Sequence, residues 1–519
     1  ADEDIITNPD EILGALRDLT ARCYLLEHEG QIGISTKGFP VPVNDPNVKL
    51  PLIGSLEPIS PGQLGDPAFL THHGAKSAYM AGSMANAISG EALVSAMGRS
   101  GFLASFGSGG VSPARLTQAI TILKKELPDG PYAFNLIHSP QEPALEQKAV
   151  DLFLEHGIKT IEASAFLRLT STVVEYRAAG LSLDKAGKVQ IKNKIIAKVS
   201  RSEVADQFLN SAPEKILALL VNNGKITSQQ AELARKVPLA DDITVEADSG
   251  GHTDNRPLVG LLPSLISLRN ETQAKNNFDT RVRIGAGGGI GTPGSVLAAF
   301  SMGAAYVVTG SVNQSCVESG TSEHVKQALS QAAATDVMMS PSADMFEMGV
   351  KVQVLKRGTL FPMRAQKLFD IYQNHSGINN LTSETREELE KKVFQNSLDE
   401  IWEECVKFFS ERDPSQLEKA EGNEKRKMAL IFRWYLGLAT HWGILGLPER
   451  ALDYQIWCGP SMGAFNDWVR GTSLEAPENR RVVKVAEELM LGAAYQYRLY
   501  ALGLLGISVP TTWERYLDR

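Results

Sequence analysis

The feature that most constrains the fold of this chain is a regular alternation of short β-like runs and helical stretches between Ser77 and Ala333. Strands that alternate with helices predict a parallel sheet, because each helix returns the chain to the same edge. Eight such units in roughly 260 residues predict an α/β fold, a closed (β/α)8 TIM barrel. An open doubly wound sheet is the alternative, although it usually has fewer strands. The strand candidates begin at Ser77, Phe102, Tyr132, Thr160, Ile195, Asp242, Arg283 and Tyr306.

The remaining sequence predicts segments on both sides of the barrel, since 519 residues exceed what one core usually holds. We expect a small N-terminal segment over 1–65, with a short helix, a hairpin and a Pro/Gly-rich linker, and the barrel over 66–340. A helical insertion near 203–240 separates its fifth and sixth strands. A basic connecting or lid segment follows over 341–382, and a helical domain rich in Trp, Tyr and Leu covers 383–519.

The composition limits the classes of function. A net charge of −8 argues against a nucleic-acid-binding protein, because no overall basic field attracts phosphates. The four cysteines lie far apart and form no C-x-x-C, which excludes a zinc ribbon or a disulfide framework and fits a reducing compartment. Without a long apolar run or a signal peptide, we expect a cytoplasmic protein with no membrane contact, and we predict no metal site. Because the chain begins at Ala1 without Met, we also expect an excised or processed piece of a larger protein.

A glycine-rich turn, "GAGGGIGTPG", follows the seventh strand candidate. It contains a G-x-G-x-x-G, but a dinucleotide-binding turn follows the first strand and has an acid about 20 residues further on. The residues at that distance here are Thr309, Gly310 and Ser311, so a dinucleotide site is disfavoured. In barrels, the loops after strands seven and eight commonly hold a phosphate, which we predict here; a turn needed only for packing is the alternative. The predicted phosphate grip consists of Gly287, Gly288, Gly289, Gly310 and Ser311.

Several blocks of sequence carry a resemblance to known proteins. The blocks "EADSGGHTD", "GAGGGIGTPGSVLAAFSMGAAYVVTGS" and "AYMAGSMANAISGEALVSAMGRSGFLASFGSGG" resemble the nitronate monooxygenase (2-nitropropane dioxygenase) group of FMN barrels, which includes FMN-dependent enoyl reductases. The blocks "ADDITVEADSGGHTDNRPL", "LKRGTLFPMRAQKL" and "IWCGPSMGAFNDWV" resemble one branch more closely. That branch is the PfaD-like enoyl reductase of polyunsaturated fatty acid synthases and the trans-acting polyketide enoyl reductases. The resemblance extends from about residue 15 to 505.

The resemblance implies an FMN-dependent enoyl-[acyl-carrier-protein] reductase, which reduces the 2,3 double bond of enoyl thioesters with NADPH or NADH. Its partners would be an acyl carrier protein and the other domains or subunits of a fatty acid or polyketide synthase. A nitronate monooxygenase-type flavin oxidase is the alternative. A hydrolase with Ser461 as nucleophile in "GPSMG" is disfavoured, because the surrounding sequence is helical and no histidine follows His441. A non-catalytic scaffold is disfavoured by the intact glycine framework.

The resemblance also implies the residues that hold the flavin. Met84 and Ala85 would lie against the isoalloxazine ring, with Gly82 and Ser83 nearby. Asn135 would hydrogen-bond the ring, and Lys198 would stabilise negative charge on it. A strand-end turn residue and a solvent-facing lysine are the respective alternatives for Asn135 and Lys198. The cofactor-binding set is completed by Gly250 and Gly251.

His252 is the predicted catalytic residue. It follows two glycines at the carboxyl end of the sixth strand, and barrel enzymes carry their chemistry at this rim. It would either polarise the thioester carbonyl or supply a proton to the α-carbon, and the sequence leaves both roles open. The pair His72-His73 is interpreted as part of a structural loop before the barrel.

A basic stretch without acidic residues is the predicted docking surface for the carrier protein, which is usually acidic. The alternative is that these charges pair with acidic helices of this chain. The helical tail offers either a homodimer surface or a lid over the barrel mouth. The sequence does not fix the acyl chain length, the stereochemistry or the choice between NADPH and NADH. The docking candidates are Lys351, Lys356, Arg357, Arg364 and Lys367.

Overall fold

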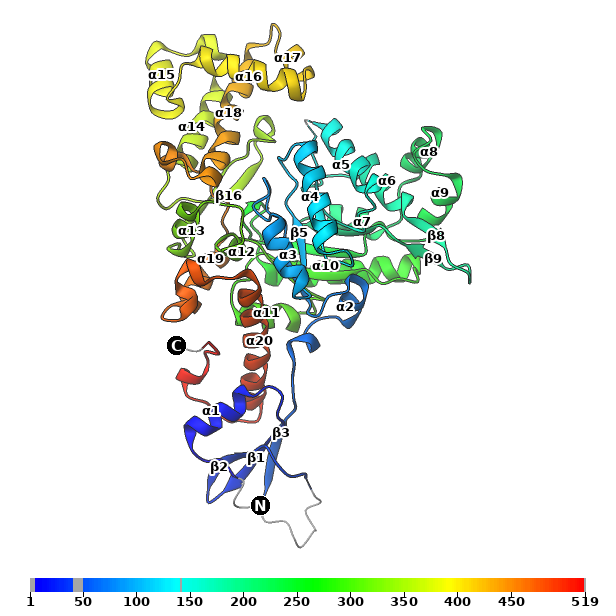
Figure 1. Cartoon of the computed structure of the whole chain (residues 1–519), viewed down its shortest axis with the longest axis vertical. Coiled ribbons are helices and arrows are strands. Elements are labelled where there is room, and N and C mark those ends of the chain that lie inside the picture. Colours follow the sequence, from blue (N-terminus) through cyan, green and yellow to red (C-terminus); the bar gives the residue numbers. More distant parts are fainter. Residues whose placement is uncertain (1–4, 41–49, 141, 518–519) are drawn as a thin grey trace.

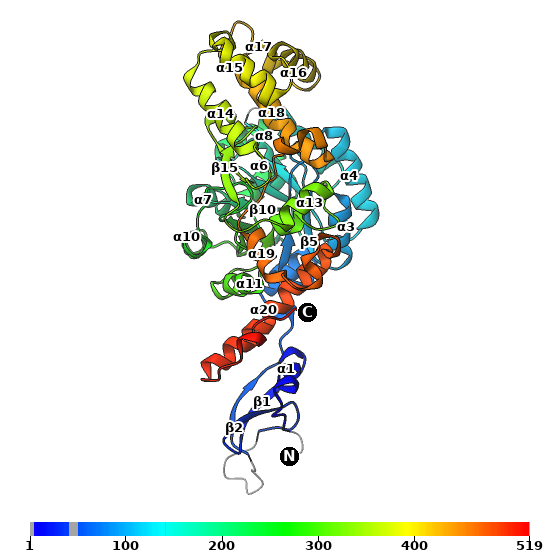
Figure 2. The same cartoon turned by 90° about the vertical axis from the view of Figure 1, so that its left-hand side faces the viewer.

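The computed structural model describes residues 5–40, 50–140 and 142–517. The molecule is elongated, with the barrel in its middle (Figure 1). Helices of residues 361–445 lie at one end and a small sheet of residues 23–56 lies at the other, as Figure 2 shows from a second side. Among the described residues, no helix is both long and apolar enough to cross a bilayer. Residues 41–49, which belong to the predicted Pro/Gly-rich linker, lie outside this part of the chain. So does Ala1, on which the expectation of an excised or processed piece was based.

Eight parallel strands form a closed barrel, which confirms the predicted fold and excludes the open sheet. Their order around the barrel is β10–β11–β13–β14–β4–β5–β6–β7, and each overlaps one predicted run. Most of their side chains are buried, as parallel strands covered by helices require. The strands are β4 (Tyr79–Ala81), β5 (Leu103–Phe106), β6 (Ala133–Ile137), β7 (Thr160–Ser164), β10 (Lys194–Val199), β11 (Asp242–Glu246), β13 (Arg283–Gly287) and β14 (Val307–Thr309).

Helices that follow the strands cover the outside of the barrel (Figure 1). Two helix starts show why the sequence folds this way: the hydroxyls of Ser112 and Thr292 each accept the backbone N–H three residues on, with a proline in the first turn. The residues predicted as an insertion contain α8 (Glu214–Asn222) and α9 (Ser228–Ala234), which pack on α6. The other elements of this region are α3 (Glu91–Arg99), α4 (Pro113–Glu126), α5 (Pro143–Glu155), α6 (Ser171–Ala179), α7 (Ser202–Leu209), α10 (Leu258–Asn276), α11 (Pro293–Ser301), α12 (Ser311–Gln314), α13 (Glu323–Ser330) and the hairpin of β8 (Leu181–Leu183) and β9 (Val189–Ile191).

The two ends of the chain pack together below the barrel. The N-terminal segment forms a three-stranded sheet next to helix α1, and the C-terminal helix α20 (Val482–Leu504) packs against it. The buried guanidinium of Arg498 on α20 donates to the backbone carbonyls of Leu16, Asp18 and Leu19, which fixes this contact. The N-terminal elements are α1 (Pro9–Arg17), β1 (Cys23–His28), β2 (Gln31–Ser35), β3 (Leu52–Leu56) and α2 (Pro67–His73).

The region after the barrel forms two spatially separate groups of elements. A small antiparallel sheet joins β15 (Val337–Pro341) and β16 (Lys351–Leu355) to β12 (Gly251–His252), which belongs to the loop after β11. Helices α14 to α18 lie beyond this sheet, whereas α19 and α20 return along the barrel and pack on α12 and α11. The helices predicted over 383–519 are therefore present, but in two groups. Their bounds are α14 (Phe361–Asn374), α15 (Ser383–Glu388), α16 (Leu398–Arg412), α17 (Ser415–Glu418), α18 (Glu424–Leu445) and α19 (Ser461–Val469).

Candidate functional site

The carboxyl ends of the barrel strands surround a cavity to which every strand except β5, or the loop after it, contributes. This is the rim where barrel enzymes place their chemistry. Gly289 is not among the residues that line the cavity, although it follows Gly288 in the same turn. The predicted residues that line it are Gly82, Ser83, Met84, Ala85, Asn135, Lys198, Gly250, Gly251, His252, Gly287, Gly288, Gly310 and Ser311.

The glycine turn after β13 has the open backbone that a phosphate grip requires. Gly288 has a φ of +84°, and a Cβ there would lie 2.7 Å from the carbonyl carbon of Ala247, so glycine is required. At Gly310, an added Cβ would meet no heavy atom of the described residues within 4 Å. This backbone lines the cavity beside Ser311, so a bound group can approach it closely.

Lys198 projects from β10 into the cavity, and its Nζ lies 3.2 Å from Oε1 of Glu246 on β11. Burial alone would lower the pKa of Lys198, but the carboxylates of Glu246 and Glu162 raise it above its ordinary value. The lysine is therefore a fixed positive charge inside the cavity. Its side chain is 20% exposed, so the alternative of a solvent-facing lysine does not describe it.

Asn135 lies in the middle of β6 (Ala133–Ile137), in a position that restricts its role. Its Nδ2 donates to the backbone oxygen of Glu162 at 2.9 Å and to Oγ of Ser164 at 2.8 Å. Both amide hydrogens are thus used within the protein, and only Oδ1 is left to meet a bound group, as an acceptor. Glu162 itself is buried, and its Oε2 accepts the backbone N–H of Ser83 at 2.9 Å.

His252 forms an ion pair with Asp344, a residue of the connection between β15 and β16. The His252 Nε2 lies 3.0 Å from Oδ2 of Asp344. Burial alone would lower the pKa of His252, but the charges of Asp344 and Glu246 raise it above its ordinary value, against the opposing charge of Lys198. Burial would likewise raise the pKa of Asp344, which the charge of His252 lowers to about 2. The pair therefore favours a protonated imidazole in the cavity.

A segment far along the chain, Trp457 to Ser461, closes one side of the cavity. The backbone N–H of Gly459 donates to Oγ of Ser311 at 2.9 Å. A Cβ at Gly250 would lie 2.9 Å from the backbone nitrogen of Cys458, so the two glycine-containing loops fit closely together. The sequence shows the glycines and the serine that make this contact, but it does not show that the segment faces the cavity.

Ser461 begins α19 and lines the cavity. A nucleophile elbow needs a strand that leads directly into the serine turn. In the described part of the chain no strand precedes Ser461 directly; Trp457 makes only an isolated bridge to Val354. The structure thus agrees with the expectation that this motif is not a hydrolase site. The cavity residues that the sequence analysis did not single out include Ser164, Glu246, Gln314 and Trp457.

A second, larger cavity of about 630 Å³ continues from the first. The two share Ala85, Asn135, Ile137, His252 and Trp457 as lining residues. Its other side includes residues of α16 and α18, so these helices face the barrel loops across the cavity. The volume falls within the range of roughly 300–1,000 Å³ that is usual for ligand sites.

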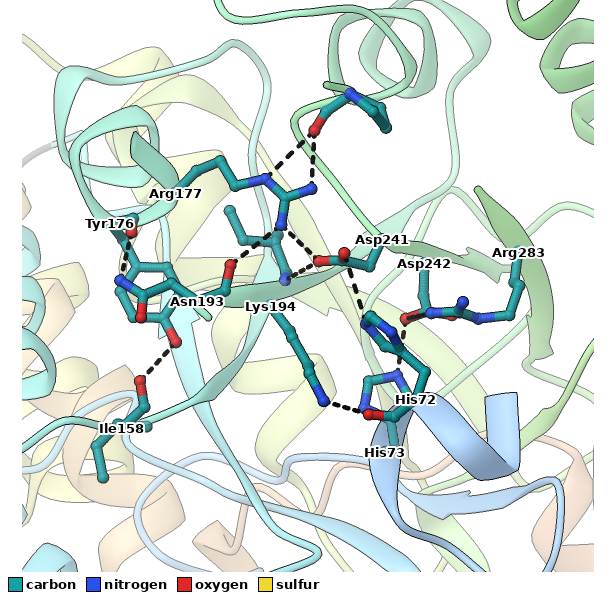
Figure 3. Close-up of polar contacts among 12 residues, drawn as sticks. His72, His73, Ile158, Tyr176, Arg177, Asn193, Lys194, Asp241, Asp242 and Arg283 are labelled. Atoms are coloured by element: carbon teal, nitrogen blue, oxygen red, sulfur yellow. Dashed lines mark hydrogen bonds and ion pairs between the residues drawn. The ribbon is translucent and has the colours of Figure 1, made fainter. Parts of the chain in front are cut away.

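The histidine pair lies at the opposite, amino-terminal rim of the barrel (Figure 3). His72 and His73 end helix α2, so the expected loop is a helix. His73 Nε2 lies 2.8 Å from Oδ2 of Asp242, which Arg283 also binds at 2.6 and 2.8 Å. The ligand atoms of His72, His73 and Asp242 lie within 4.8 Å of one another, but Arg283 already neutralises the carboxylate. We assign this cluster a structural role.

The five docking candidates differ in their surroundings. Arg364 forms a buried ion pair with Asp453, which removes it from the surface. Lys367 Nζ lies 2.5 Å from Oε2 of Glu388, and Arg357 Nη1 lies 3.7 Å from Oδ2 of Asp336. For these three residues the alternative of internal pairing describes the structure. Lys351 and Lys356 are exposed on β16 and directly after it.

Comparison with known proteins gives two family matches. The nitronate monooxygenase model matches residues 71–411. The model of the inserted helical domain of [acyl-carrier-protein] S-malonyltransferase matches residues 375–454, which include α15 to α18. The first match spans most of the chain, and the second is confined to the helices over the barrel mouth.

Individual relatives agree with the motif resemblance. A polyunsaturated fatty acid synthase subunit of Thraustochytrium sp. is 49% identical over 454 residues, and the polyketide biosynthesis protein PksE of Bacillus subtilis is 43% identical over 437 residues. The matched part is 86% and 84% of this chain, but it spans only 30% and 57% of those proteins. The crystal structure of the enoyl reductase domain of MlnA, from the macrolactin biosynthesis cluster of Bacillus amyloliquefaciens, matches with a TM-score of 0.81 and 40% identity. It covers 85% of this chain and 99% of that domain.

Proposed function

This chain belongs to the nitronate monooxygenase family, and we propose that it is an FMN-dependent enoyl-[acyl-carrier-protein] reductase that uses NADPH or NADH in polyunsaturated fatty acid or polyketide synthesis. The observation that carries the proposal is the pair of joined cavities. An open glycine turn, a half-buried lysine and a histidine with a raised pKa line the smaller one, and the larger one leads away from the histidine. The names of the synthase relatives and of the enoyl reductase domain support the same activity.

The residues of the smaller cavity fit FMN. The backbone of Gly287, Gly288, Gly310 and Ser311 would hold its phosphate, with Lys198 and Asn135 at its ring. Lys198 would offset negative charge on the ring, and Asn135 would accept a hydrogen bond through Oδ1. The chemistry that FMN supplies here is hydride transfer from the nicotinamide to the β-carbon of the enoyl thioester.

His252 would act on the thioester. Its Nε2 faces Asp344, so Nδ1 is the ring atom left to donate to the carbonyl oxygen or to deliver a proton to the α-carbon. Asp344 would keep the imidazole protonated and oriented, as a positioning residue. The larger cavity supports an acyl substrate over a small nitronate, because a small molecule would leave that volume empty.

Carrier-protein docking is proposed for Lys351 on β16 and Lys356 directly after it; β16 pairs with β12, the strand of His252. Reversing both charges should raise KM for the carrier-bound substrate by up to about tenfold, through lost electrostatic steering. A small enoyl thioester should be unaffected. Lys185→Glu in the β8–β9 hairpin is the control for a change of net charge. Equal effects on both substrates would reject this surface.

The proposed function is tested by an absorption spectrum of the purified protein, before and after anaerobic addition of NADPH. We expect a flavin spectrum that bleaches with NADPH and returns when crotonyl thioester is added. A flavin that ignores NADPH but reacts with a nitronate would identify the oxidase instead. A colourless protein that cannot be reconstituted with FMN would overturn the cofactor assignment.

A further inference from the structure

The larger cavity has a wall made by one face of α18. Arg433, Trp434, Gly437, Thr440 and His441 all line it, and their spacing of three and four residues places them on the same side of the helix. Gly437 is at the centre of this face. It leaves a notch between two turns that carry bulky side chains.

A glycine in the interior of a helix destabilises it relative to alanine, so its presence needs a reason. In α20 the reason is packing, because a Cβ at Gly492 would lie 2.5 Å from Cγ of Pro293. At Gly437, a Cβ would meet no heavy atom of the described residues within 4 Å. Gly14 in α1 is equally free of neighbours, but Gly437 differs in lining a cavity that reaches His252.

The polar groups around this cavity are largely paired with the protein itself. Arg412 Nε on α16 donates to Oε1 of Glu142 at 2.7 Å, which ties the helical wall to the barrel loop after β6. Trp434 Nε1 donates to Oε2 of Glu404 at 2.7 Å. What remains for a ligand is therefore chiefly apolar surface, which includes Leu116, Leu145, Leu152, Phe408, Phe409 and Leu430. Such a lining suits a hydrocarbon chain.

We propose that Gly437 determines substrate size: it keeps the cavity wide enough for the acyl chain of a long enoyl thioester, which lies between α18 and the barrel loops. This inference rests on the proposed function, since it places the reacting end of the same substrate at His252. A side chain at position 437 would fill the notch and collide with the distal part of a long chain. A four-carbon chain, which ends nearer to His252, would not reach it.

The test compares Gly437→Leu and Gly437→Met with Gly14→Leu, an exposed helix position outside the cavity. We expect kcat/KM for a twelve-carbon enoyl thioester to fall about tenfold or more in both position-437 variants, the scale of losing one to two kcal/mol of apolar contact. The value for crotonyl thioester should stay within about twofold, and Gly14→Leu should change neither. Gly437→Ala, a better helix former, should fold at least as stably. Equal losses on both chain lengths, or no loss on the long one, would overturn the proposal.

A binding measurement separates this proposal from the reductase assignment. Binding of saturated dodecanoyl thioester is measured by calorimetry, which needs no turnover. If the wild type binds it and the position-437 variants do not, Gly437 limits chain length even when no reductase activity is found. If wild type and variants bind it equally, Gly437 does not limit chain length, whatever the activity. Melting curves of all variants check folding, and the methionine variant replaces the leucine variant if the latter does not fold.

Discussion

Two histidine–aspartate pairs lie at opposite rims of the barrel and behave differently. At the amino rim, His73 contacts Asp242, and burial lowers the pKa of His73 even though the aspartate opposes this. At the carboxyl rim, His252 contacts Asp344, and the pKa of His252 is raised. The same two residue types, at similar distances, thus favour opposite protonation states.

Two features of the surroundings differ: the side chain of His73 is fully buried whereas that of His252 is 30% exposed, and each aspartate has different further partners. Asp242 is bound by the buried guanidinium of Arg283, which neutralises the charge that would otherwise hold a proton on His73. Near His252, by contrast, Glu246 adds negative charge to that of Asp344. Burial and the further partners of each aspartate together decide whether a histidine stabilises the fold or remains available for chemistry.

The largest expected effect is on catalysis at the carboxyl rim. His252→Gln should lower kcat for an enoyl thioester about 10²–10⁴-fold, because a positioned proton donor is lost. Its melting temperature should match the wild type, since the side chain lines a cavity. A variant that keeps full activity would show that the His252–Asp344 pair at the carboxyl rim is structural, like the pair at the amino rim. Steady-state assays measure kcat, and thermal denaturation measures the melting temperature, of the variant and the wild type.

Asp242→Asn should act on stability instead. Removing this carboxylate leaves Arg283 buried without its counter-charge, which destabilises by about 3–5 kcal/mol. The folded pKa of Asp242 is lowered, because Arg283 and His73 outweigh the effect of burial. Its contribution is therefore fully present above the unfolded value of 3.8 and is lost as the pH falls through the lower folded value. Denaturant unfolding at pH 7 and at acidic pH measures this, and an unchanged midpoint would contradict it.

A smaller effect is expected for His73→Gln, the matched partner of the His252 variant. It loses one hydrogen bond to a charged group, which contributes about 1.5–3 kcal/mol. Activity per folded molecule should stay at the wild-type level. Loss of activity without loss of stability would mean that the amino rim acts in the reaction. The same unfolding and activity assays serve both histidine variants.

The smallest expected change is a shift of pH dependence in Asp344→Asn. The charge of Asp344 raises the pKa of His252, so the protonated form persists to higher pH in the wild type. In the variant the alkaline limb of kcat/KM should move to lower pH, while the melting temperature changes little. A profile that moves to higher pH, or does not move, would refute the coupling. Asp254→Asn, which removes the half-buried partner of Arg201, is the control.

Much of the fold could be predicted from the sequence, because its signals are local. Each barrel strand overlaps a predicted run, and the caps at Ser112 and Thr292 lie where a hydroxyl precedes proline. The family resemblance is confirmed by relatives with 40–49% identity. The family resemblance for Lys198, and the strand-end position of His252, also predicted residues that line one cavity, since the carboxyl ends of parallel strands meet at one rim.

Contacts between distant residues could not be predicted in this way. Asp344 lies 92 positions from His252, and no periodic pattern connects them. Arg364 was expected at the surface, yet Asp453 pairs with it inside the protein. Such partners are chosen when helices and sheets pack, which local propensity does not encode.

By itself, the sequence determined the eight βα units, the rim on which the chemistry-bearing residues lie and the glycines that keep the backbone open, because spacing along a strand or turn dictates these. Only the tertiary structure decided which histidine has a lowered pKa and which a raised one, that α16 and α18 line the larger cavity, and that Ser461 lines the smaller one. The physical reason is that protonation and access depend on burial and on charges brought together by packing, and these arise only in the folded chain.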